Sequence, residues 1–557
     1  MRYENLTEAK ACFSNYRDSD FRTGQAEAIQ FALDSPKKIV VIEAATGSGK
    51  SLIAMASGAA VGEVTCLVHS KILQTQYTDD FPEARSLFGR ANYDCLQTPG
   101  NSCEDCTSNE YSICRHHLAY KKITKNEHDN ELPEPCPYKI QKFKVLSSRY
   151  RILNYDYFLS ETNYIGNFSG QEFVVIDEAD SLEATLINFV TLTFTRYALR
   201  RIGMDEEAAK LKMTSKFKDQ LVQSWKNFGQ TALIRVNAII GKINNTIKAA
   251  GNNITPQIES AMKELKKIVR LKEKINLFLN NVDDTWMLDN QSDKLIFRPL
   301  WLTPEMAEKF LWQHAKKFVL MSASFYPRPI LAKTLGLDID DIDYHMIPSQ
   351  FPVANRPVYI APVANLTYKT MDVEIPKLIP AIRSIVDSRP NSKGIIHAVS
   401  YTLAHKIVDL MNSPRYITHN STDRQEVLDR FMESDEPLIL VSPSLERGVS
   451  LEDDKARLVI IAKSPYLSLA DKIVSARLYS SKLGSDWYKA TMMLTVLQMA
   501  GRAVRSAEDY AECFILDEQV EQAITSRPGF LPGWFMDALE FRLPDKPMDR
   551  IKITKEN

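Results

Sequence analysis

At 557 residues the chain is too long for one hydrophobic core, so we expect three or four domains. Hydrophobic residues make up 44% of the sequence and charged residues 25%, which are ordinary globular values and exclude wholesale disorder. The 69 basic and 70 acidic residues give a formal net charge of −1, so a surface that binds phosphates has to be a local groove.

Signals for export or membrane insertion are missing from the sequence. No stretch approaches the roughly 20 apolar residues that span a bilayer. The N-terminal residues, MRYENLTEAKACF, lack the basic-then-apolar order of a signal peptide. We therefore expect a monomeric intracellular protein, cytoplasmic or associated with the nucleoid, with no membrane partner. Three of the eight cysteines, Cys12, Cys66 and Cys513, lie among apolar residues and are expected in packed cores.

The first half of the chain begins as an α/β unit that is then interrupted. Apolar runs at KIVVIEA and VTCLVHS alternate with helical stretches, the pattern of a parallel sheet. Residues 91–150 break this pattern with cysteines, prolines and charge, and strand character returns at 172–180. Residues 181–298 are predicted to be mostly helical, because Ile258, Met262 and Leu265 recur at helical spacing. An ordinary helical subdomain and a direct nucleic-acid role both explain that segment.

A second α/β unit follows a proline-punctuated linker. Its predicted strands lie at 393–399, 437–442, 456–464 and 511–517. We therefore predict an α/β fold with four parts. They are a first unit of residues 1–90, 151–180 and 299–350, a cysteine-rich insert of residues 91–150, a helical insert of residues 181–298, and a second unit of residues 351–557.

The segment KIVVIEAATGSGKSLIAMA predicts a phosphate-binding loop. An apolar strand precedes a glycine-rich turn and a helix, which is the context that such a loop requires. Its backbone N–H groups would wrap a β-phosphate at the helix N-terminus. Lys50 has the length to reach the β- and γ-phosphates, and the Ser51 hydroxyl suits Mg²⁺. The predicted nucleotide-binding residues of the loop are Thr46, Gly47, Ser48, Gly49, Lys50 and Ser51.

An acidic pair after the strand at 172–177 predicts the catalytic half of an ATPase site. Asp177 would hold the water shell of Mg²⁺, and Glu178 would orient or deprotonate the attacking water. Asp180 is expected to couple this site to the SAS segment, Ser322-Ala323-Ser324. Acidic residues after a strand can also simply begin a helix, but about 130 residues after a phosphate loop the catalytic interpretation is favoured.

The third part of the predicted ATPase site lies far along the chain, in LQMAGRAVRS. Gln498, Gly501, Arg502 and Arg505 have the spacing that puts them on one face of a helix. Arg502 and Arg505 are expected to neutralise charge that develops on the γ-phosphate. Because they belong to the second α/β unit, ATP would bridge two domains, and its hydrolysis would open and close a cleft. A solvated basic face is the alternative.

Five cysteines lie within residues 95–136 and predict a metal site in the cysteine-rich insert. They are Cys95, Cys103, Cys106, Cys114 and Cys136. Thiolates are soft ligands that suit zinc or an iron–sulfur cluster, and the chemistry of the residues leaves both open. Basic and aromatic residues nearby, such as Arg115 and Tyr120, fit either contacts to a nucleic-acid strand or a solvated face.

In order, AATGSGKS, DEAD, SAS, RGVSL and QMAGRAVRS resemble the motifs of superfamily 2 helicases, and the cysteine insert resembles the XPD/DinG branch. FRTGQ resembles an adenine-reading element with Arg22 and Gln25, and GRANYDC, CPYKIQK and LNYDYFL extend the resemblance over roughly residues 20–520. The resemblance implies two RecA-like motor domains, an iron–sulfur domain and a helical arch. It also implies ATP, Mg²⁺ and a [4Fe–4S] cluster, with Cys95, Cys106, Cys114 and Cys136 as ligands and Cys103 as the alternate.

The function implied by the resemblance is ATP-dependent unwinding of DNA, with 5′-to-3′ movement on single-stranded DNA and action at junctions with duplex.

The sequence departs from the branch at Asp180, where the family has His, and at Arg447–Ser450, where it has Glu-Gly-x-Asp. Asp180 also fits a DEAD-box RNA helicase, although that group lacks the cysteine insert. An ATPase subunit that binds single strands and remodels a nucleoprotein complex carries the same motor motifs. DNA repair is one of several pathways left open.

Overall fold

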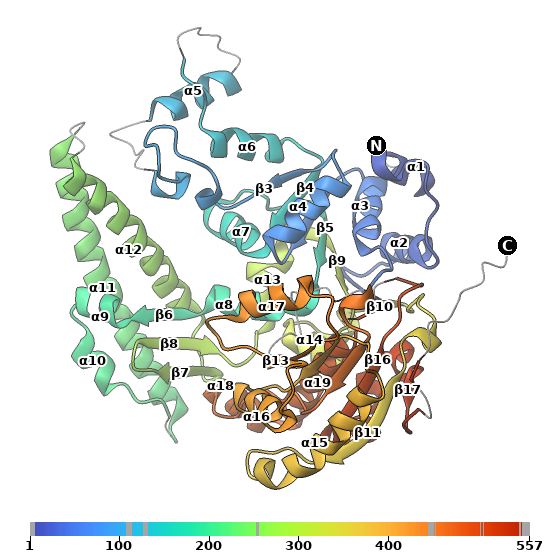
Figure 1. Ribbon diagram of the computed structural model, residues 1–557. Coiled ribbons are helices and arrows are strands. Elements are labelled where there is room, and N and C mark those ends of the chain that lie inside the picture. Colours follow the sequence, from blue (N-terminus) through green and yellow to red (C-terminus); the bar gives the residue numbers. More distant parts are fainter. Residues whose placement is uncertain are drawn as a thin grey trace.

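The computed structural model describes residues 6–106, 114–125, 132–214, 216–251, 255–443, 451, 453–501, 503–504, 506–544 and 547–548. Two seven-stranded sheets and one three-stranded sheet organise these residues. In Figure 1 the first large sheet lies in the upper half of the molecule and the second in the lower half. The predicted α/β fold is confirmed.

The first sheet has the strand order β10-β1-β9-β5-β2-β4-β3, and its described strand pairs are parallel. Apolar residues cover both of its faces: Val40 and Ile42 pack into one core and Ile39 and Val41 into the other. The strands are β1 Ile39–Ala44, β2 Val64–Val68, β3 Arg85–Leu87, β4 Tyr150–Asn154, β5 Gln171–Asp177, β9 Ala315–Ser322 and β10 Ile342–Ile347.

Helices on both faces of this sheet supply the facing apolar side chains. Cys66 is fully buried in one of the two cores, as predicted, whereas Cys12 is only half-buried at its edge. The helices of this unit are α1 Leu6–Ala11, α2 Gln25–Asp34, α3 Lys50–Val61, α4 Lys71–Asp80, α7 Tyr155–Ser160, α8 Leu182–Val190, α13 Pro304–Phe310 and α14 Arg328–Thr334.

Two insertions project from the first unit on one side (Figure 1). The cysteine-rich insert carries α5 Arg115–Thr124 and α6 Pro137–Leu146. The other insert is a long antiparallel pair, α11 Lys218–Ala250 and α12 Pro256–Asn281, with the short α9 Arg196–Arg201 and α10 Asp205–Lys210 at its base. Thr255 caps α12 by accepting a hydrogen bond from the Ile258 N–H. The mostly helical character predicted for this segment is present.

The sequence interpretation missed a small antiparallel sheet at the base of the long helices. It has the order β6-β8-β7, with strands β6 Leu192–Thr195, β7 Trp286–Asn290 and β8 Lys294–Pro299. Leu192 and Phe194 are fully buried while the residues between them face outwards. Such alternation over four residues is too short to stand out in the sequence, and only the pairing of strands about 100 residues apart stabilises it.

The second sheet has the order β13-β14-β12-β15-β16-β11-β17 and is again parallel in its described pairs. Cys513 on β16 is buried in its core, as predicted. The strands are β11 Val358–Ala364, β12 Gly394–His397, β13 Tyr416–Thr418, β14 Ile439–Ser442, β15 Leu458–Ile461, β16 Glu512–Asp517 and β17 Leu539–Glu540. The helices are α15 Met371–Asp387, α16 Tyr401–Met411, α17 Arg424–Glu433, α18 Lys472–Ser480, α19 Lys482–Ala500, α20 Glu518–Ser526 and α21 Gly533–Met536.

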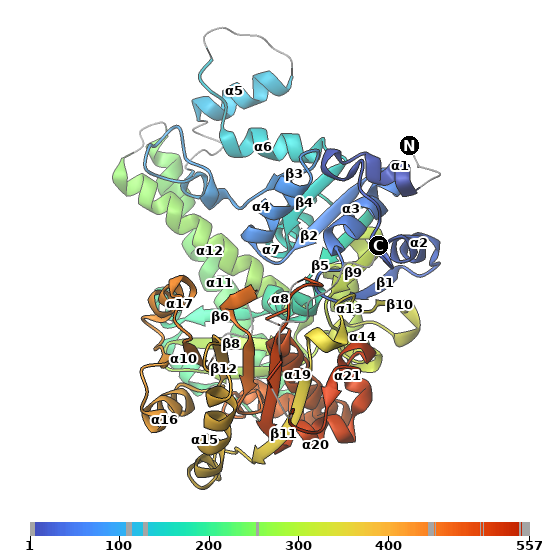
Figure 2. The ribbon, with the colours of Figure 1, turned by 45° about the vertical axis from the view of Figure 1, so that its right-hand side comes forward.

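Turned by 45°, the molecule shows the first sheet above the second unit, which includes α19 (Figure 2). The carboxyl end of β1 faces the second unit, because Ala45 and Thr46, which follow β1, line a cavity together with Leu497 of α19 and Trp534. Ligand sites in open parallel sheets lie at this edge. Among the described helices, none is both long enough and apolar enough to cross a membrane.

Candidate nucleotide site and cysteine-lined cavity

The predicted phosphate loop connects the end of β1 to the first residue of α3. Gly47 and Gly49 have φ angles of +82° and +75°, which side chains rarely adopt. A Cβ atom on Gly47 would also lie 2.4 Å from Cζ of Phe351, so the Phe351 ring packs directly on the loop. Lys50 begins α3, where the helix dipole favours an anion.

The side chains of Arg22 and Gln25 bind backbone carbonyls of the phosphate loop. The Gln25 side chain, 1% exposed, donates from Nε2 to the carbonyls of Ser48 at 2.9 Å and Gly49 at 3.3 Å. Its Oε1 accepts the backbone N–H of Arg22 at 2.8 Å. Arg22 Nη1 in turn donates to the Gly47 carbonyl at 2.6 Å. These two side chains therefore bind three successive loop carbonyls, and the adenine-reading role expected for them stays a prediction.

Asp177 ends β5 with its carboxylate 4% exposed. Tyr77 donates its hydroxyl to Asp177 Oδ2 at 2.9 Å, and the backbone N–H of Glu178 donates to Oδ1 at 3.0 Å. Burial raises the pKa of Asp177 to about 6, and the positive charge of Lys50 opposes that rise. Glu178 has a φ angle of +57°, a conformation that non-glycine residues adopt mainly at functional sites.

Asp180 connects the two units. Its Oδ1 accepts the Ser322 hydroxyl at 3.0 Å, which is the contact predicted for it. Its Oδ2 accepts Nε2 of Gln498 at 3.3 Å, and Gln498 lies on α19 of the second unit. The segments that carry the acidic pair, the SAS motif and Gln498 therefore meet at one carboxylate.

The prediction that one helical face presents Gln498, Gly501, Arg502 and Arg505 is wrong. Helix α19 ends at Ala500, and the Gly501 N–H closes its last turn by donating to the Leu497 carbonyl at 3.0 Å. Glycine is a poor helix former and commonly marks such an end. Arg502 and Arg505 lie outside the described residues, as does the Arg447–Ser450 segment.

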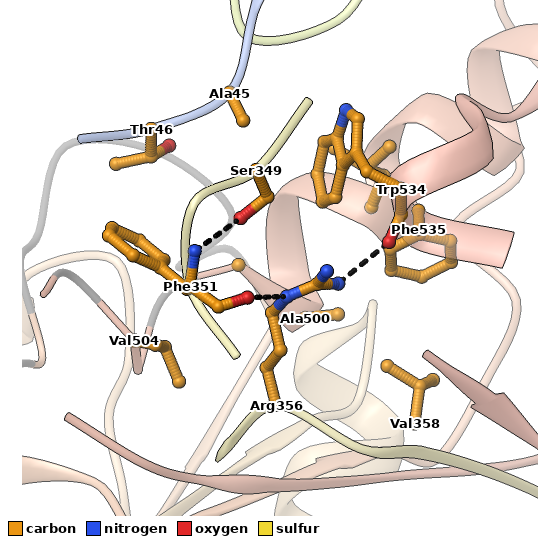
Figure 3. A pocket seen from close by; sticks show the side chains of 12 residues that line it. Ala45, Thr46, Ser349, Phe351, Arg356, Val358, Ala500, Val504, Trp534 and Phe535 are labelled. Atoms are coloured by element: carbon orange, nitrogen blue, oxygen red, sulfur yellow. Dashed lines mark hydrogen bonds between the residues drawn. The ribbon is translucent and has the colours of Figure 1, made fainter. Parts of the chain in front are cut away.

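A cavity lies beside the contact between the phosphate loop and the second unit, lined by residues of both (Figure 3). Thr46 borders one side, and Phe351, Arg356 and Trp534 border the other. Arg356 donates to the carbonyls of Phe351 at 3.1 Å and Trp534 at 2.7 Å, and its guanidinium lies 5.6 Å from the Trp534 ring centre. The cavity thus offers flat, mostly apolar walls within reach of the loop.

All five cysteines of the insert line one cavity, which they share with Arg90, His116, His117 and Tyr138. Cys103 is 5% exposed, and its Sγ lies 4.0 Å from Sγ of Cys136. Burial, with a smaller contribution from Cys136, raises the pKa of Cys103 to about 12. Within the described part of the chain, no three Cys, His, Asp or Glu side chains converge on a point where they could hold a single metal ion.

The Cys103–Cys106 turn also docks on α12. Lys266 donates to the carbonyls of Glu104, at 3.0 Å, and Cys106. Arg270 pairs with the Glu104 carboxylate at 3.3 Å. The cysteine-rich insert and the long helices are therefore in direct contact through Glu104 and Cys106.

Sequence reasoning missed the hydroxyls that hold Asp177 and the walls of the cavity. Tyr155 donates to the Asp177 carbonyl, and Tyr77 comes from a helix a hundred residues earlier. Tyr155 lies within LNYDYFL, which the family resemblance had marked without assigning it a role. Trp534 and Phe351 carried no spacing signal, because only the meeting of the two units brings them to the loop.

Two families match the chain. Residues 18–219 match the res subunit of type III restriction enzymes, and residues 382–536 match the helicase C-terminal domain. The chain is 23% identical to the ATP-dependent DNA helicase YoaA of Escherichia coli (strain K12), covering 89% of this chain and 90% of YoaA. It is 22% identical to the ATP-dependent DNA helicase CHL1 of Vanderwaltozyma polyspora, over 69% of this chain and 56% of CHL1.

Solved structures share the fold. An XPD helicase structure aligns with a TM-score of 0.54 at 15% identity, covering 91% of this chain and 98% of that one. S. tokodaii Xpd4 aligns with a TM-score of 0.55 at 14% identity, covering 94% of this chain and all of that one (100%). The prediction of two RecA-like domains is confirmed by this likeness. In its two family matches, in the relatives that span most of its length and in its fold, the chain is similar to the XPD/DinG-like helicases of superfamily 2.

Proposed function

We propose that the protein is an ATP-dependent DNA helicase that moves on single-stranded DNA. One observation carries the proposal: Asp180 accepts hydrogen bonds from Ser322 of the first unit and Gln498 of the second. A site made only for hydrolysis has no need of a second domain, whereas a motor has to couple hydrolysis to relative domain movement. The relatives named as ATP-dependent DNA helicases support DNA as the substrate.

The roles in the ATP site follow from the positions of the side chains. We assign the β- and γ-phosphates to the N-terminus of α3 and to Lys50, with Mg²⁺ held through Ser51 and Asp177. Glu178, next to Asp177, orients the attacking water. Gln498 links the acidic segment to the second unit through its hydrogen bond to Asp180. Arg502 and Arg505 remain the proposed partners of the γ-phosphate. The purine base fits against the flat walls of the cavity at Phe351 and Trp534.

The cysteine-lined cavity supports a [4Fe–4S] cluster over zinc. A single zinc ion with bonds of about 2.3 Å draws four sulfurs to roughly 3.8 Å from one another. Only the Sγ atoms of Cys103 and Cys136 are described at such a distance, 4.0 Å. A cluster binds each thiolate at a different iron, so sulfurs spread around a cavity suit it better. We propose Cys95, Cys106, Cys114 and Cys136 as ligands, with Cys103 as the alternate.

The strand path and its direction are part of the proposal. The family resemblance supports 5′-to-3′ movement and loading at junctions between single-stranded and duplex DNA. Basic side chains of α5, such as Lys121, suit contacts to phosphates, and aromatic ones such as Tyr120 suit stacking on bases. The cluster would hold the segment that presents them.

Strand displacement tests the function. We expect the purified protein to unwind 5′-tailed DNA duplexes with ATP, and to fail on 3′-tailed duplexes. Lys50→Ala and Glu178→Gln should each abolish DNA-stimulated ATP hydrolysis, because one removes the phosphate ligand and the other the group that orients the water. Unwinding of RNA duplexes in preference to DNA would favour a DEAD-box type of activity. Hydrolysis stimulated by single strands, with no unwinding of any duplex, would favour a remodelling ATPase.

A further inference from the structure

The two motor domains share a small hydrophobic core far from the phosphate loop. Trp301 and Ile330 of the first unit pack against Trp487 and Ala490 of α19, and all four side chains are buried. Arg477 of α18 lies between the two tryptophans, with its guanidinium 3.6 Å from the Trp301 ring centre and 4.2 Å from that of Trp487. We refer to Trp301, Ile330, Arg477, Trp487 and Ala490 as the pivot cluster.

Arg477 also ties the pivot cluster to the ATP site. Its Nη2 donates to Oε1 of Glu183, and both side chains are buried, 7% and 11% exposed. Glu183 lies on α8, the helix that begins two residues after Asp180. Burial raises the pKa of Glu183, and the charge of Arg477 opposes that rise. Separating such a buried pair would leave two uncompensated charges, so the contact resists opening.

Two further contacts join the second unit to the rest of the chain, one to the first unit and one to the helical insert. The Tyr326 hydroxyl of the first unit lies 3.1 Å from Oγ1 of Thr491 on α19. Lys472 of α18 pairs with Asp289 of the small antiparallel sheet at 2.9 Å. None of these contacts involves a residue that we assign to ATP.

Helices α18 and α19 pack closely against each other. A Cβ atom on Gly484 would lie 2.0 Å from the Arg477 carbonyl oxygen, so the two helices touch backbone to backbone. Trp487 lies near the start of α19, whereas Gln498 and Ala500 lie at its end beside the ATP site. The 13 residues from Trp487 to Ala500 span about 20 Å at the helical rise. A rotation of about 10° at Trp487 therefore moves Ala500 by about 3–4 Å.

We infer that Arg477 is a positioning residue, and that the pivot cluster stays closed through the ATPase cycle as the point about which the two domains turn. This inference rests on the proposed function. Opening then widens the cavity between Thr46 and Trp534 while Glu183 and Arg477 remain paired. Helix α19 transmits the rotation to Gln498 and to the sequence that follows Gly501.

Hydrogen–deuterium exchange on the full protein tests this directly. We compare the nucleotide-free protein with the complex of adenylyl imidodiphosphate and oligothymidine. Amides of residues 182–190 and 472–490 should exchange equally slowly in both states, while those of residues 351–358 and 497–501 should become more protected in the complex. A change at residues 472–490 as large as that at 497–501 would overturn the pivot. No change at 351–358 would instead contradict the cleft closure of the proposed function.

Variants of Arg477 separate positioning from folding. Arg477→Lys keeps the charge but loses the flat surface that lies between Trp301 and Trp487. We expect its DNA-stimulated kcat to fall roughly tenfold or more, because the two motor domains are no longer held in the relative orientation that catalysis needs. Its affinity for a fluorescent ATP analogue should stay within about threefold of the wild type, since the phosphate loop is intact.

Arg527→Ala is the matched control. Arg527 also pairs with a residue of α19, Asp486, but the pair lies within the second unit, and the Arg527 side chain is 39% exposed. Both its kcat and its nucleotide affinity should stay near the wild type. If Arg477→Lys melts at the wild-type temperature and turns over ATP as fast as Arg527→Ala, the positioning role is wrong. Loss of nucleotide affinity in step with kcat would also contradict it.

Discussion

Gln25 offers a sharp test of how the phosphate loop is held. Replacing it with alanine removes the donors to the Ser48 and Gly49 carbonyls and the acceptor for the Arg22 N–H. Each hydrogen bond contributes about 1 kcal/mol, and a buried group left without a partner costs about 1–3 kcal/mol. Water that enters the vacated space offsets part of this cost. We therefore expect the ordered conformation of the phosphate loop to be destabilised by roughly 2–3 kcal/mol.

The assay is equilibrium binding of fluorescent ATP and GTP analogues. If the whole loss appears in binding, affinity falls roughly 30- to 140-fold, because about 1.4 kcal/mol corresponds to a factor of ten. The matched control is Gln30→Ala, on the same helix, whose amide donates only to the exposed side chain of Asp34 at 2.7 Å. That variant should bind both nucleotides as the wild type does.

The two nucleotides distinguish the two roles considered for Gln25. If Gln25 holds the loop, ATP and GTP lose affinity by the same factor, because both carry the same phosphates. If it reads adenine, only ATP binding weakens. Affinity of Gln25→Ala within about threefold of the wild type for both nucleotides would refute the reasoning from the loop contacts.

Three further predictions concern packing, charge and the cysteines. Gly58→Ala should lower the free energy of unfolding in urea by about 1–3 kcal/mol, because the new Cβ would lie 2.2 Å from Cβ of Val64. Gly241→Ala, in open space on α11, should raise the free energy of unfolding by about 0.5–1 kcal/mol, and equal effects of the two variants would contradict the packing argument. Burial raises the pKa of Glu43, so the folded protein binds this proton more readily than the unfolded chain, and stability falls as the pH rises through the folded pKa. Glu43→Gln keeps an acceptor for the Tyr344 hydroxyl and the Phe325 N–H. This variant should be more stable than the wild type near pH 8, and the difference in the free energy of unfolding should vanish below about pH 4. A difference that does not depend on pH would contradict the raised pKa of Glu43. Anaerobically purified protein should be brown, with about four irons per chain. Cys106→Ser should lose more iron than Cys103→Ser, and Cys12→Ser is the control that should keep its iron. Stoichiometric zinc without visible absorbance would contradict the iron–sulfur proposal.

The periodicity of the sequence located most of the strands of the two sheets. Runs such as FVVI before Asp177 are apolar on every residue, because helices cover both faces of a parallel sheet. The short β6 and β8 gave no such signal, since half of their residues face outwards and their pairing joins positions about 100 residues apart. The end of α19 at Ala500 was also missed, because helical spacing continues in the letters beyond the glycine that ends the helix.

Local motifs predicted the ATP site that we propose, because the phosphate loop and the acidic pair each depend on a few neighbouring residues. Sequence also predicted that Asp180 couples to the SAS segment, and the structure shows the contact at Ser322. It did not predict that Gln25 would bind loop carbonyls, since a carboxamide suits a base edge and a backbone carbonyl equally well.

What the sequence determined by itself is the set of candidate residues: the side chains that we assign to phosphate, the carboxylates that we assign to Mg²⁺, and the thiols that are available for a metal. Each of these depends on residue type and on short spacing. Tertiary structure alone decided how the two motor domains meet. The placement of Arg477 between Trp301 and Trp487, against Glu183, joins residues from three distant parts of the chain. Such a contact is stabilised by burial and by a charge pair that exist only after both domains have folded, so no local pattern encodes it.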